Sequence, residues 1–183
     1  MGARVMHAKY RGRFLSLLSK CLTRNELLPA HIVAAFSKRL CRSVISSPPS
    51  TGLFVLALVS NLLRKHSECR FLIQRSDDGE IEDAFVTSSA DPIETHALKT
   101  SLWEVVALEK HYFSSIGVLA KSLGTIEESK LPLHQIEEFS DHTYESLFEM
   151  ERKKRKETAL AFVEPQSLLT DNDVFSTFLT TNK

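Results

Sequence analysis

The chain has 183 residues, of which 43% are hydrophobic, and its 23 basic and 23 acidic residues cancel to a formal net charge of zero. This is enough for one domain with a real core, or for part of a larger protein. Six glycines and six prolines are too few to favour a β-sandwich with many turns. The three cysteines form no C-x-x-C pair, which argues against a zinc site and favours a reducing compartment, the cytosol or the nucleus.

Charge is distributed very unevenly along the chain. Residues 1–75 contain 13 basic and 2 acidic residues, a net charge of +11, whereas residues 76–183 have a net charge of −11. This uneven charge distribution indicates a basic surface able to bind phosphate or an acidic partner. The alternative is that the acidic half folds against the basic half and neutralises it, and both interpretations stay open.

The N-terminal region predicts a flexible segment, residues 1–8, and then a first helix over about residues 9–22. Phe14, Leu17, Leu18 and Cys21 would form the buried face of this helix, and Cys41 would be a second buried thiol. No acid precedes Glu26, so a mitochondrial presequence is an alternative interpretation of this basic segment.

A second helix is expected over residues 28–47, ending before the Pro48–Pro49 pair. Its sides differ, because Lys38 and Arg42 project opposite an apolar stripe, with Arg39 on the flank of the basic side. The stripe consists of Ile32, Val33, Phe36, Leu40 and Val44. The sequence therefore predicts one buried face and one exposed basic face.

A third helix, capped by Ser50 or Thr51 and running to about His66, contains the run from Gly52 to Leu63, which is apolar on all sides. This run is shorter than the roughly 20 residues that cross a bilayer, so it predicts a central, fully buried helix and no transmembrane segment. Residues 67–75 predict a short helix or a final turn.

Residues 76–91 predict an acidic loop, and a long helix should follow as far as about Tyr112. Asp91 would cap this helix and Pro92 would be its first residue. The apolar residues Leu98, Leu102, Val105 and Val106 recur at helical spacing.

Three shorter helices are expected after the long one. The first contains Ile116 and Leu123 and is closed by Gly124, the second lies within residues 132–139, and the third is capped by Ser140 or Asp141. Residues 164–183 would form an extended C-terminal strap. The predicted fold is all-α: one helical-repeat domain over residues 9–163, arranged as an irregular α-solenoid of HEAT or armadillo-like hairpins.

Motifs for catalysis are not found. The sequence contains no Walker, dinucleotide-binding, zincin or nucleophile-elbow pattern, and its seven histidines are dispersed. We therefore expect no enzymatic activity, no catalytic or metal-binding residues, no cofactor and no small-molecule substrate. Basic clusters are the stronger signal for contact with a partner protein or with RNA phosphate, and their members are Lys38, Arg39, Arg42, Arg64, Lys65, Arg152, Lys153, Lys154, Arg155 and Lys156.

Three segments together resemble the C-terminal region of the nucleolar complex protein 4 family, within the CCAAT-binding-factor-type superfamily. They are LLPAHIVAAFSKRLCRSVISSPP, VLALVSNLLRKHSECRFLIQR and DPIETHALKTSLWEVVALEKHY, and the likeness extends from about Phe14 to Leu169. The resemblance implies an α-solenoid scaffold of the nucleolus that pairs with a nucleolar protein 14-type partner. It also implies a role in maturing small-subunit ribosomal RNA within the small-subunit processome. A transcription-type nucleic-acid-binding factor and a mitochondrial helical adaptor are the alternatives.

Overall fold

The computed structural model describes residues 4–25, 27–74, 83–125 and 132–154. The chain separates into two units, Met1–Glu149 and Met150–Lys183. Within the described ranges the regular structure consists of α- and 3₁₀-helices without any strand, so the all-α prediction is confirmed. The solenoid arrangement stays a prediction.

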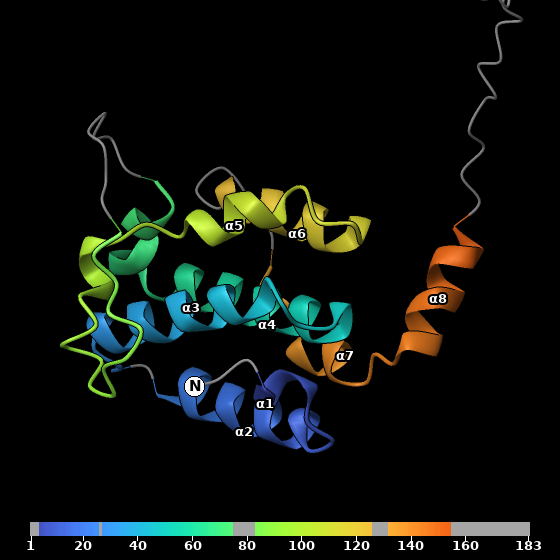
Figure 1. Cartoon of the computed structure of the whole chain (residues 1–183), viewed down its shortest axis with the longest axis horizontal. Coiled ribbons are helices and arrows are strands. Elements are labelled where there is room, and N and C mark those ends of the chain that lie inside the picture. Colours follow the sequence, from blue (N-terminus) through green and yellow to red (C-terminus); the bar gives the residue numbers. More distant parts are fainter. Residues whose placement is uncertain (1–3, 26, 75–82, 126–131, 155–183) are drawn as a thin grey trace, which may run out of the picture. The chain divides into compact units, whose positions relative to one another are not determined.

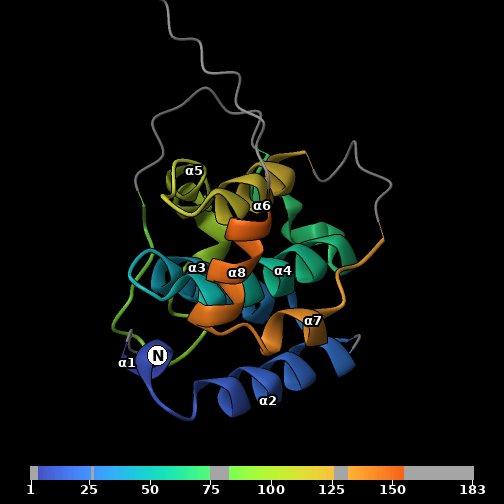
Figure 2. The ribbon, with the colours of Figure 1, turned by 90° about the vertical axis from the view of Figure 1, so that its right-hand side faces the viewer.

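The helices of the first unit form three layers, which two perpendicular views show in the same order (Figures 1 and 2). Helices α3 and α4 make the middle layer, α5 and α6 lie on one side of it, and α1, α2 and α7 lie on the other. The elements are α1 (Arg4–His7), α2 (Arg11–Arg24), α3 (Ala30–Val44), α4 (Pro49–Lys65), η1 (Ser67–Leu72), η2 (Ala97–Lys99), α5 (Trp103–Leu108), α6 (Ser114–Gly124) and α7 (Ile136–Ser140). Helix α8 (Tyr144–Lys153) begins in the first unit and ends in the second.

Helix α4 is the centre of the core. All its residues from Pro49 to Leu63 are buried, and it contacts α2, α3, α6 and α7. This confirms the prediction of a central buried helix, which follows from an apolar run without a polar face. Pro49 is the first residue of α4, a position that needs no N–H donor, so the proline pair starts this helix as well as ending the preceding segment. No helix in the described ranges is long and apolar enough to cross a membrane.

The prediction of a long helix after Asp91 is wrong. The chain instead makes turns, the 3₁₀-helix η2 and the short helix α5. Two backbone groups that a continuous helix would use are taken by other elements: the Leu102 N–H donates to the Leu72 carbonyl at 2.8 Å, and the Ser101 carbonyl accepts from Lys38 at 2.6 Å. His96 adopts a left-handed conformation (φ 52°), which a helix does not allow. Tertiary hydrogen bonds therefore override the local helical period.

The predicted buried face of α2 is confirmed in part, because Phe14 and Leu18 are partly buried against the core. Leu15, Ser19 and Leu22 are its buried residues, whereas Leu17 and Cys21 are exposed. The prediction of a buried thiol is therefore wrong for Cys21 and confirmed for Cys41. Residues Arg4–His7 form α1 with a fully buried Met6, which differs from the flexible segment expected for residues 1–8.

The boundaries of the later helices are closer to those predicted from the sequence. Helix α6 ends at Gly124 as predicted, and α7 overlaps the predicted range of 132–139 but extends one residue beyond it, to Ser140. Helix α8 is preceded by a reciprocal pair in which the Thr143 N–H donates to Ser146 Oγ and the Ser146 N–H donates to Thr143 Oγ1. Thr143 therefore caps α8 in place of Ser140 or Asp141. Residues 76–82 of the acidic loop and the predicted strap over residues 164–183 lie outside the described residues.

Two helical glycines provide a matched test of this packing. A Cβ atom on Gly117 would lie 2.8 Å from the Glu109 carbonyl oxygen, whereas one on Gly12 would meet nothing within 4 Å. We expect Gly117→Ala to lower the free energy of unfolding by about 1–3 kcal/mol, because backbone must move to relieve the overlap. Gly12→Ala should raise it by roughly 0.5–1 kcal/mol through helix propensity. Urea denaturation followed by circular dichroism measures both, and equal effects would contradict the close α5–α6 approach.

Candidate functional site

The most concentrated polar chemistry in the first unit surrounds the ammonium group of Lys38. This side chain is 0% exposed, and its Nζ lies 2.6 Å from the Ser101 carbonyl oxygen, 3.1 Å from Glu104 Oε2 and 3.3 Å from Asp83 Oδ2. Glu104 is also 0% exposed, while the Asp83 side chain is 29% exposed. Three oxygen acceptors thus take the three donors of a lysine that has no contact with solvent.

Trp103 completes this group, which we call the Lys38 cluster (Lys38, Asp83, Ser101, Trp103 and Glu104). Its ring centroid lies 5.4 Å from Lys38 Nζ, close enough for a cation–π attraction, and its Nε1 donates to Asp83 Oδ2 at 2.8 Å. The cluster joins α3 to the start of α5 and to Asp83, which is more than 40 residues away from Lys38 along the chain. It is therefore a long-range tie between segments.

Burial and charge act in opposite directions on the acids of the cluster. Burial raises the pKa of Glu104, and the backbone hydrogen bond and the nearby Lys38 charge offset this only in part. Partial burial also raises the pKa of Asp83, but the hydrogen bond from Trp103 and the Lys38 charge outweigh it, so the pKa of Asp83 lies below its usual value. Burial, together with the Glu104 charge, strongly raises the pKa of the neighbouring Cys41 thiol, so this thiol stays protonated.

The structure corrects the predicted exposed basic face of α3. Lys38 is buried and cannot contact RNA or a partner protein directly. The Arg39 guanidinium donates to the Ser89 carbonyl, and Arg42 donates to Thr87 Oγ1 at 3.0 Å and lies 6.0 Å from the ring centroid of Phe85. All of these partners come from residues 83–104, which cover α3. At this face, therefore, the chain's own second half contacts all three cations, but acids neutralise only Lys38, so the neutralisation that the sequence left open is confirmed for Lys38 alone.

The other predicted cations fall into two groups. Arg64 is half-buried and donates to the Pro132 carbonyl at 3.3 Å, and Lys65 donates to the Thr23 carbonyl at 2.9 Å, so both tie α4 to neighbouring segments. Arg152 and Lys153 are exposed in the last turn of α8, and Lys154, just beyond the helix, is also exposed and pairs with Glu151 at 2.6 Å. Arg155 and Lys156 lie outside the described residues.

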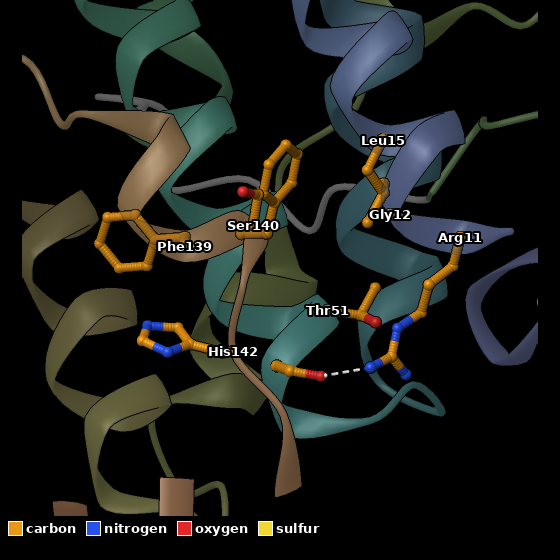
Figure 3. A pocket seen from close by; sticks show the side chains of 9 residues that line it. Arg11, Gly12, Leu15, Thr51, Phe139, Ser140 and His142 are labelled. Carbon is orange, nitrogen blue, oxygen red and sulfur yellow. Dashed lines mark hydrogen bonds between the residues drawn. The ribbon is translucent and has the colours of Figure 1, made fainter. Parts of the chain in front are cut away.

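A small cavity lies where α2, α4 and α7 meet (Figure 3). Its volume is about 20 Å³, which has room for a water molecule but not for a substrate. Arg11 lines it on one side and donates to Ser50 Oγ at 3.0 Å, and Phe139 and His142 line it on another (Figure 3). In the described residues, no group of three or more His, Cys, Asp and Glu residues is placed to hold a metal ion.

Sequence reasoning missed the acids that pair with Lys38, because nothing local links positions 38, 83 and 104. It also missed the cations of α2, Arg13, Lys20 and Arg24, which are exposed. A signal for these was present in the acid-free stretch before Glu26, together with their spacing of seven and four residues, which places them on one helix face.

Removal of the buried charge tests the Lys38 cluster. We expect Lys38→Met to lower the free energy of unfolding by about 3–5 kcal/mol, because the buried Glu104 carboxylate loses its counter-ion. The double variant Lys38→Met/Glu104→Leu should recover most of that loss, since no unpaired charge is then buried. Chemical denaturation of the two variants measures the difference. Equal stability of the single and double variants would show that the two charges are not coupled.

The pH dependence tests Asp83 separately. Because its folded-state pKa is below its unfolded value, Asp83 stabilises the fold above the unfolded pKa of about 3.9, and this contribution is lost as the pH falls through the folded-state value. The stability difference between the parent chain and Asp83→Asn should therefore shrink on acidification. Denaturant midpoints measured at neutral and acidic pH give this difference, and a constant gap would contradict the lowered pKa.

Comparisons with known proteins confirm the resemblance predicted from the sequence. The chain is 37% identical to human Nucleolar complex protein 4 homolog over 172 residues, which are 90% of this chain and 32% of that protein. It is 34% identical to the Arabidopsis thaliana Protein NUCLEOLAR COMPLEX ASSOCIATED 4 over 197 residues, covering 92% of this chain and 34% of that protein. The chain thus spans about a third of the length of these curated relatives. The CBF/Mak21 family profile matches residues 1–120, and the chain therefore belongs to the CBF/Mak21 family.

Proposed function

We propose that the chain is a non-enzymatic scaffold of ribosome biogenesis that works in the nucleolus. The observation that carries the proposal is the similarity, over about nine-tenths of this chain, to proteins named for a nucleolar complex in an animal and a plant. In the finer version, the chain supports processing of small-subunit ribosomal RNA within the small-subunit processome and pairs with a nucleolar protein 14-type partner.

The structure supports a scaffold in two ways. The first unit is built around α4, which is buried from Pro49 to Leu63, and long-range polar contacts, such as that of Lys38 with Glu104, hold segments of this unit together. Among the predicted RNA-contacting cations, Arg152, Lys153 and Lys154 are exposed at the end of α8. We assign any direct phosphate contact to this basic end rather than to α3, where Lys38 is buried.

Cellular location and RNA processing test this proposal together. A fluorescently tagged full chain should collect in nucleoli, and depletion of the native protein should cause precursors of small-subunit ribosomal RNA to accumulate on a northern blot. The large-subunit precursors of the same cells are the internal control. A mitochondrial location would favour the helical-adaptor alternative, and unchanged precursor levels would overturn the processing role.

A further inference from the structure

The outward side of α2 carries a row of cations that the rest of the described chain leaves without partners. Arg13, Lys20 and Arg24 are exposed and lie within about 40° of one another around the helix axis, opposite the buried Leu15 and Leu22. None of the three forms a hydrogen bond or an ion pair with another described residue. We call these three residues the α2 basic row.

This row differs from the basic residues of α3 and of the end of α4. The cations of α3 and the end of α4 donate to groups of the same chain, as Lys38 does to Glu104 and Lys65 to the Thr23 carbonyl. Helix α2 contains no acidic residue in its whole length, Arg11–Arg24, so the charge of the row is not reduced from within the helix. Its positive potential is therefore available to another molecule.

An apolar stripe runs beside the basic row. Tyr10 and Leu17 are 64% and 56% exposed, Cys21 is also exposed, and the helical period places the three next to one another along the axis. Leu17 and Cys21 line a shallow groove together with Lys20, Arg24 and Asn25. In both views α2 lies in an outer layer of the first unit, with α4 and α7 on its inner side (Figures 1 and 2).

We infer that this face of α2 is a docking surface for an amphipathic helix of a partner protein that carries an acidic stripe beside an apolar one. The charge of the basic row selects acidic side chains, and the adjacent Leu17 and Cys21 match apolar side chains at helical spacing. An apolar centre flanked by charge is typical of protein–protein contacts. Nucleic-acid backbone would meet the cations but would leave Leu17 and Cys21 without a complementary surface. The inference does not depend on the proposed role in ribosome biogenesis.

Site-specific photo-crosslinking identifies the occupant. The full chain with Leu17→p-benzoylphenylalanine is expressed in cells, irradiated and digested, and the linked fragment is sequenced by mass spectrometry. Val118 on α6, which is 69% exposed, carries the same photo-reactive group in the control. We expect position 17, and not position 118, to link to a segment of another protein with acidic and apolar residues at helical spacing.

The linked segment is then synthesised, and its affinity for the purified chain is measured by fluorescence anisotropy. Lys20→Glu/Arg24→Glu should weaken binding roughly tenfold by reversing two rim charges. The control Lys110→Glu/Lys121→Glu has the same change in net charge at exposed sites away from α2 and should leave the affinity within about twofold. Leu17→Ala should also weaken binding, while far-UV circular dichroism stays unchanged in every variant.

Other outcomes would overturn the inference. Linkage of position 17 to RNA would assign the face to nucleic acid, and linkage to the chain's own acidic half would make it an internal contact. Equal yields at positions 17 and 118, or a linked segment without acidic side chains, would show that α2 offers no selective surface. An unchanged affinity in Lys20→Glu/Arg24→Glu would exclude the basic row from binding.

Discussion

The first unit depends on a lysine that the fold removes completely from water. Burying an ammonium group is costly unless its donors find acceptors, and Lys38 finds the Ser101 carbonyl and the carboxylates of Glu104 and Asp83. These groups come from a segment far along the chain. The requirement that they surround one atom fixes where residues 83–104 lie against α3. It also explains the break before α5, because the Ser101 carbonyl accepts from Lys38 and not from the helix.

The pairing of Lys38 with Glu104 and Asp83 changes how the uneven charge distribution of the sequence is interpreted. The basic first half and acidic second half look like two opposed surfaces, yet at α3 they meet inside one unit and neutralise each other. Arg39 and Arg42 also donate to the second half, to the Ser89 carbonyl and the Thr87 hydroxyl, but these neutral groups fix the two side chains without cancelling their charge. Cations used in this way hold the fold together. Those that remain for recognition are the ones without internal partners, which include the basic row on α2.

This division of the cations affects how binding experiments on the chain are interpreted. A charge reversal at Lys38 alters stability before it alters binding, so lost association in such a variant would not identify a binding surface. The exposed positions on α2 and the end of α8 permit charge changes without disturbing the core around α4. Membership of the CBF/Mak21 family therefore describes how the chain folds, while the partners depend on side chains that the fold leaves outside.

The sequence by itself determined the features that depend on local pattern. The apolar run from Gly52 to Leu63 could only be a buried helix, and Gly124 marked the end of α6. Tertiary structure decided the burial of Lys38, the breaking of the helix expected after Asp91 and the face that α2 turns inward. The physical reason is the same in each case. A helical period describes only the neighbours along one segment. A buried charge, or a carbonyl that accepts a hydrogen bond from another segment, is satisfied by groups distant in sequence. The free energy of these tertiary contacts outweighs the local helical preference.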